Sequence, residues 1–152
     1  MKGIDMPTRT ARTAWDGGFK DGSGQTELTS SGLATFDVSF PKRASDDGGG
    51  ATNPEELVAA SHSACYSMSL AKLLEDAGAT PQTLDVTAEV TIGPDPEGGL
   101  KLTGIALTVR AEVEGIDDAG FQEAAQAAKA GCPISKALAA VDITLDAALE
   151  TA

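Results

Sequence analysis

The sequence has few aromatic side chains and few cysteines. Phe, Trp and Tyr make up 4% of its 152 residues, and only two residues are cysteine. Two cysteines are too few for the disulfide framework of a small secreted protein. Because aromatic residues are scarce while alanine and glycine are abundant, we expect close backbone packing with small side chains at the contacts.

Positive charge and long apolar runs are also lacking. Eleven Lys and Arg residues face 23 Asp and Glu residues, which gives a net charge of −12. This charge argues against a nucleic acid or an anionic membrane as partner, because phosphate contacts need clustered Lys and Arg. No apolar run approaches the roughly 20 residues of a membrane span, and residues 1–5 lack the apolar region of a signal peptide. We therefore expect a cytoplasmic protein with reduced thiols.

The length and the 41% apolar content are typical of one globular domain, here residues 1–152. Residues 1–8 read as a lead-in and residues 42–51 as a mobile loop. Alternating apolar residues and turn signals predict strands over residues 10–15, 25–29, 34–40, 84–92, 100–113 and 141–149. Helical patterns cover residues 118–130 and 134–139, besides a long central helix. Strands in antiparallel runs, interrupted by helices, indicate an α+β fold.

The central helix has the clearest start and stop signals. Asn53 can cap its first N–H groups, Pro54 suits the first helical position, and Gly78 supplies the stop. Glu55 and Glu56 favour the positive end of the helix dipole. Apolar residues recur at helical spacing and predict a buried stripe: Leu57, Ala60, Ala64, Met68, Ala71 and Leu74.

Each cysteine has a chemical and a structural interpretation. Cys132 follows Gly131 and precedes Pro133, so it falls at a helix N-terminus, where free N–H groups favour a thiolate. The alternative is a small buried cap. Cys65 lies near the middle of the central helix and on its own evidence is a buried core residue. His62, one turn earlier, is on the same side of the helix, and we expect it at the edge of the core, bonded to backbone.

Glu55 and Cys65 cannot meet within one helix. They are ten residues apart, which places them roughly 15 Å apart along a straight helix axis. If both serve one site, Glu55 must come from a second copy of the helix, packed antiparallel in a dimer. Small residues between them permit such close packing: Ala59, Ala60, Ser61, Ser63 and Ala64.

Two segments resemble the signatures of a known family. TNPEELVAASHSACYSM (residues 52–68) is similar to the helix signature of the OsmC/Ohr family, the osmotically inducible protein C and organic hydroperoxide resistance proteins. KAGCPIS (residues 129–135) is similar to its second cysteine motif, and the two cysteines are 67 residues apart. The histidine before the first cysteine and the Ala-Gly-Cys-Pro form resemble the OsmC branch, and the pattern covers nearly the whole chain.

The resemblance implies an antioxidant thiol peroxidase that reduces organic hydroperoxides and hydrogen peroxide. It implies an intertwined homodimer, with antiparallel sheets around two central helices and each site at the subunit interface. By position, Cys65 matches the peroxidatic cysteine, Cys132 the resolving cysteine and Glu55 the catalytic glutamate. A dithiol reductant, lipoyl-type or a small molecule, would reset the enzyme. The family needs neither a metal nor a bound organic cofactor.

The arginine that the family uses to hold the thiolate has no obvious match. Many OsmC-type members carry it in the third strand, where this chain has Ser39. Arg43, a few residues on, is our choice, and Arg12 in the first strand is the alternative.

Two other classes of function remain open at this point. Cys65, His62 and Cys132 could form a metal site, although no paired Cys-x-x-Cys is present. A non-enzymatic protein could instead bind a small apolar ligand in the interface pocket, with both thiols serving only as packing.

Overall fold

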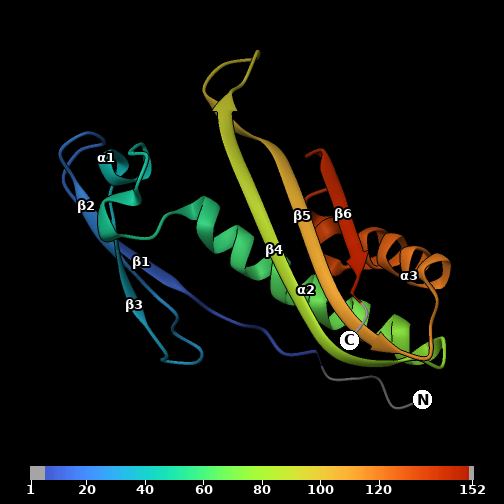
Figure 1. Ribbon diagram of the computed structural model, residues 1–152. Coiled ribbons are helices and arrows are strands. Elements are labelled where there is room, and N and C mark those ends of the chain that lie inside the picture. The colour runs from blue at the N-terminus through green and yellow to red at the C-terminus, as the bar shows by residue number, and fades with distance from the viewer. Residues whose placement is uncertain (1–5, 151–152) are drawn as a thin grey trace. The chain divides into compact units, whose positions relative to one another are not determined.

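A computed structural model of the chain describes residues 6–150 (Figure 1). The chain divides into two compact units, Met1–Pro54 and Glu55–Ala152. Of the predicted lead-in, residues 1–5 lie outside the described residues, as does the segment considered for a signal peptide. Residues 6–11 have no regular secondary structure, as predicted for the remaining part of the lead-in.

The first unit contains a three-stranded antiparallel sheet in the order β1-β2-β3. The strands are β1 (Arg12–Asp16), β2 (Ser23–Glu27) and β3 (Thr35–Val38). A glycine-rich turn joins β1 to β2 in an antiparallel hairpin. A Cβ atom at Gly22 would lie 2.2 Å from the carbonyl oxygen of Gly18, so this turn requires glycine.

The predicted loop over residues 42–51 is partly helical, contrary to the sequence interpretation. The short helix α1 (Phe40–Arg43) and the 3-10 turn η1 (Gly48–Gly50) occupy much of it. Ser39 caps α1, since its Oγ accepts a hydrogen bond from Lys42 N at 3.3 Å. Pro41 lies in the first turn of α1, where proline is favoured. The third strand therefore ends at Val38 rather than at Phe40.

The second unit has a sheet in the order β4-β5-β6. The strands are β4 (Thr80–Pro94), β5 (Leu100–Glu114) and β6 (Ile143–Leu149). β4 and β5 form a long antiparallel hairpin, as predicted, but β6 pairs parallel to β5. The prediction of purely antiparallel sheets is wrong here because two helices connect β5 to β6, and a helical crossover returns the chain in the same direction.

Three helices complete the second unit: α2 (Pro54–Asp76), α3 (Asp118–Gly131) and α4 (Pro133–Ala137). α2 begins at Pro54 as predicted, and Gly78 follows its end with a φ of 82°, a left-handed conformation that favours glycine. Asp117 caps α3, since its Oδ1 accepts a hydrogen bond from Gly120 N at 2.8 Å. No helix of the described residues is long and apolar enough to cross a membrane.

The core of the second unit lies between its sheet and its helices. Every second residue of β5 is buried from Ile105 to Ala111, so one face of the strand supplies the core. α2 and α3 both pack on that face (Figure 1). The core side chains of the two helices are Tyr66, Leu70, Leu74, Phe121, Ala124, Ala125 and Ala128.

The buried face of α2 differs from the predicted stripe. Its buried residues after the first turn are His62, Tyr66, Leu70 and Leu74. Of the predicted stripe, Ala60, Ala64 and Met68 are exposed, with Met68 at 73%. The predicted stripe was wrong because alanines and small polar residues occur all around the helix. Two faces of α2 therefore have apolar residues at helical spacing, and only one of these faces contacts this core.

Candidate active site

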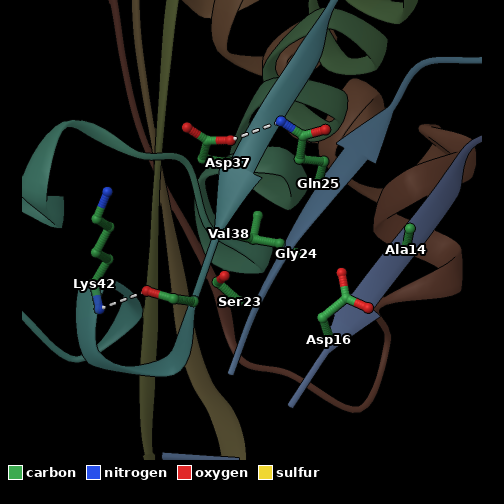
Figure 2. Close-up of a pocket in the computed structure, with 9 residues that line it drawn as sticks. Ala14, Asp16, Ser23, Gly24, Gln25, Asp37, Val38 and Lys42 are labelled. Atoms are coloured by element: carbon green, nitrogen blue, oxygen red, sulfur yellow. Dashed lines mark hydrogen bonds between the residues drawn. The ribbon is translucent and has the colours of Figure 1, made fainter. Parts of the chain in front are cut away.

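The first unit has a pocket whose lining includes no cysteine. The pocket has a volume of about 430 Å³ and lies against the three strands (Figure 2). Its polar lining includes Asp16, Gln25, Asp37 and Lys42, with a hydrogen bond of 3.1 Å from Gln25 Nε2 to Asp37 Oδ1. Neither cysteine lines it. We therefore place the chemistry of the protein in the second unit.

The second unit brings the two cysteines together. Cys65 is in the middle of α2, and Cys132 lies at the junction of α3 and α4. Their thiol groups lie close enough to shift each other's pKa, and neither cysteine is in a disulfide. Cys65 is partly exposed, whereas Cys132 is 0% exposed. One thiol is thus partly accessible to small molecules, and its neighbour is buried.

Cys132 is held in a setting that favours its thiolate. It is the N-cap residue of α4, as the sequence predicted. Burial opposes its ionisation, but the neighbouring Cys65 thiol, the backbone N–H groups of Ser135 and Ile134 at the start of α4, and the Ser135 hydroxyl favour the thiolate and outweigh burial. The pKa of Cys132 is therefore lowered.

Cys65 is in the opposite electrostatic situation. Burial and the neighbouring Cys132 thiol raise its pKa, and the Ile134 backbone and the Ser69 hydroxyl offset only part of this. A thiol whose pKa is raised reacts slowly with peroxide at neutral pH, because the thiolate is the nucleophile. Fast chemistry at Cys65 therefore needs an additional positive group.

His62 forms a buried hydrogen bond with a side chain, not with backbone as predicted. Its Nε2 lies 2.7 Å from Ser135 Oγ, and the two residues are 0% and 5% exposed. Burial lowers the pKa of His62, so the imidazole is neutral at pH 7. Sequence reasoning missed Ser135, although its position three residues after Cys132 in the first turn of α4 was a signal of contact with that cysteine.

The structure does not bring Glu55 to Cys65 within the chain. Glu55 is a buried residue of the first turn of α2, and Cys65 is ten residues further along the same helix. The two arginines considered for the site belong to the first unit: Arg43 ends α1, and Arg12 is exposed on β1. The described residues include no group of three His, Cys, Asp or Glu side chains able to hold a metal, so the Cys65–His62–Cys132 metal alternative has no support.

Comparison with known proteins places the chain in a family. A family described as OsmC-like protein matches residues 46–146. "Peroxiredoxin OsmC" of Escherichia coli (strain K12) is 42% identical over 137 residues, which cover 90% of this chain and 93% of that protein. "Organic hydroperoxide resistance protein" of Xanthomonas axonopodis pv. citri is 34% identical, with 71% and 75% covered.

A solved structure agrees in fold as well. The organic hydroperoxide resistance protein OhrB of Bacillus subtilis superposes with a TM-score of 0.73 at 30% identity, over 91% of this chain and 98% of that one. The α+β architecture agrees with the fold that the resemblance implied. The chain belongs to the OsmC/Ohr family.

Proposed function

We propose that this protein is a thiol-dependent peroxidase that reduces organic hydroperoxides and hydrogen peroxide. The observation that carries the proposal is the contact between a partly exposed thiol, Cys65, and a fully buried one, Cys132. This asymmetry suits a peroxidatic cysteine that meets the substrate and a resolving cysteine behind it. The names of the relatives, a peroxiredoxin and organic hydroperoxide resistance proteins, describe the same chemistry.

The proposed reaction has three steps, in which the two cysteine sulfurs are the redox-active atoms of the protein. The Cys65 thiolate attacks the O–O bond, which gives Cys65 sulfenic acid and an alkoxide that leaves as the alcohol after taking a proton. The Cys132 thiolate then attacks the sulfenic sulfur, which forms the Cys65–Cys132 disulfide and releases hydroxide, protonated to water. A dithiol reductant, lipoyl-type or a small molecule, returns both thiols by exchange. A reducing cytoplasm, as expected for the chain, would supply it.

We assign the activation of Cys65 to Arg43, with Arg12 as the alternative. The raised pKa of Cys65 means that the thiolate needs a fixed positive charge, and a guanidinium can also bind the peroxide. Glu55 would orient the arginine through a bidentate pair. Glu55 would come from a partner chain, since it cannot meet Cys65 along one helix.

The Arg43→Ala variant should raise the pKa of Cys65 and slow the first step at pH 7. Because the thiolate is what reacts, the rate should recover as the pH rises. The measurement is thiolate absorbance against pH in a Cys132→Ser background, where Cys65 is the only thiol. Arg12→Ala is the matched control. An unchanged titration in Arg43→Ala with a shifted one in Arg12→Ala would transfer the role to Arg12.

We also propose that the protein is a homodimer through the exposed face of α2. Ala60, Ala64 and Met68 are exposed on this helix at spacings of four residues, which forms a narrow apolar stripe. The small side chains permit the close approach of a second α2. An antiparallel pair would place Glu55 of one chain near the level of Cys65 of the other.

The whole proposal is tested by one assay on the wild-type protein. Under a dithiol reductant, hydrogen peroxide and an alkyl hydroperoxide should both be consumed in many turnovers, and a monothiol should support less. After one equivalent of peroxide without reductant, mass spectrometry should show the Cys65–Cys132 disulfide. Two free thiols and no peroxide consumption would contradict the proposal, and a small apolar ligand retained in native mass spectrometry would then favour a binding protein.

A further inference from the structure

A row of buried side chains ends at Cys132. The His62 imidazole meets the Ser135 hydroxyl at 2.7 Å, and Ser135 lies in the first turn of α4, three residues after Cys132, where its hydroxyl favours the Cys132 thiolate. The next contact is the thiol of Cys65. All members except Cys65 are buried, so water does not compete with these hydrogen bonds and each is stronger than at the surface.

The tautomer of the His62 imidazole determines which group donates in its hydrogen bond with Ser135. Among the described residues His62 Nδ1 is buried without a hydrogen-bond partner. A neutral imidazole carries one N–H group, and a buried N–H without a partner is rarer than a buried lone pair without one. The proton therefore belongs on Nε2, which donates to Ser135 Oγ. The hydroxyl hydrogen of Ser135 is then free to donate to the sulfur of Cys132.

We propose that Ser135 is a catalytic residue of the resolving step and that His62 positions it. Ser135 donates a hydrogen bond to the Cys132 thiolate, and His62 fixes the direction of that donation. The thiolate is therefore ready when Cys65 becomes sulfenic acid. Attack forms the S–S bond, the C–S–OH oxygen leaves as hydroxide, and the negative charge moves from Cys132 to the leaving group. The inference rests on the proposed peroxidase function and deepens it.

The titratable groups around Cys132 come from one helix. Cys65, His62 and Tyr66 of α2 all face it or the row of side chains that ends at it. Tyr66 is buried, its hydroxyl donates to the Ala125 carbonyl oxygen at 2.9 Å, and its pKa is raised by burial and by the charge at Cys132. On α4, Lys136 is exposed. Because burial lowers the pKa of His62 and raises that of Tyr66, a titration of Cys132 near pH 7 in a Cys65→Ser background follows Cys132 itself.

The first experiment needs no peroxide. In the Cys65→Ser background, thiolate absorbance is followed against pH with Ser135 and with Ser135→Ala. The hydroxyl donor stabilises the thiolate, so its removal should raise the pKa of Cys132, and Ser135→Thr should restore it. Ser31→Ala is the matched control, since its hydroxyl accepts a hydrogen bond from Leu33 N in an exposed turn far from Cys132 in sequence. This titration decides the donor role even if the protein has no peroxidase activity.

The second experiment separates the two chemical steps. With one equivalent of peroxide, Ser135→Ala should form Cys65 sulfenic acid at the wild-type rate and convert it to the disulfide about tenfold more slowly or worse, as expected for a lost hydrogen bond to a charged group. His62→Phe should also slow the second step, and His62→Gln, which keeps an N–H donor at similar reach, should restore it. If Ser135→Ala does not fold, the comparison of His62→Phe with His62→Gln tests the proposal. The proposal would be overturned if Ser135→Ala formed the disulfide at the wild-type rate and left the titration of Cys132 unchanged. An equal slowing of sulfenic acid formation and disulfide formation would also overturn it.

Discussion

Replacing Cys65 by serine should abolish peroxide consumption and leave the fold intact. A serine hydroxyl is not ionised at neutral pH and does not form a sulfenic acid, so the first step has no nucleophile. Cys65 is only partly buried, and serine is nearly the same size, so the free energy of unfolding should change little. The measurement is peroxide consumption with excess dithiol, beside thermal unfolding of both proteins.

Cys132→Ser is the matched control for this variant, because it makes the same chemical change in the same pair of thiols. It should consume one equivalent of peroxide, accumulate Cys65 sulfenic acid and then stall or over-oxidise. The two variants should therefore differ in the first turnover and not only in the steady state. Turnover retained by Cys65→Ser, or a first turnover lost equally in both variants, would contradict the assigned order of the two cysteines.

The boundaries of the second unit were predictable where local chemistry sets them. Pro54 starts α2, Asp117 caps α3, and Gly78 ends the first of these helices in a conformation that favours glycine. Each signal acts within one turn of backbone, so the sequence contains all of it. The same holds for Cys132 at the start of α4.

The errors concern contacts between elements that are distant in sequence. Nothing within residues 143–149 determines whether β6 runs parallel or antiparallel to β5, since the direction depends on the helical crossover before it. Similarly, α2 has apolar residues on two faces, and only the position of the core selects Tyr66 and Leu70 over Ala64 and Met68. The interpretation of His62 failed for the same reason, because its partner Ser135 is 73 residues away.

Replacing Glu55 by glutamine should lower peroxide turnover by about a hundredfold, which is the usual scale for a misplaced activating group. The neutral amide cannot hold an arginine as a bidentate carboxylate does. Because Glu55 and Cys65 are ten residues apart on one helix, the proposed dimer requires that Glu55 act on the partner's Cys65. That requirement can be tested directly, by measuring activity in a heterodimer of two inactive chains.

Two tags allow purification of a heterodimer that combines Glu55→Gln in one chain with Cys65→Ser in the other. If Glu55 acts across the interface, this heterodimer contains one complete site and should have about half of the wild-type activity. If Glu55 acts within its own chain, this heterodimer has no complete site and no activity.

The control combines Cys65→Ser with Cys132→Ser. Because these two thiols meet within one chain, that heterodimer has no complete pair and should stay inactive. Recovery in both heterodimers would mean that the cysteines also pair across the interface, and recovery in neither would contradict the proposed action of Glu55 on the partner's Cys65.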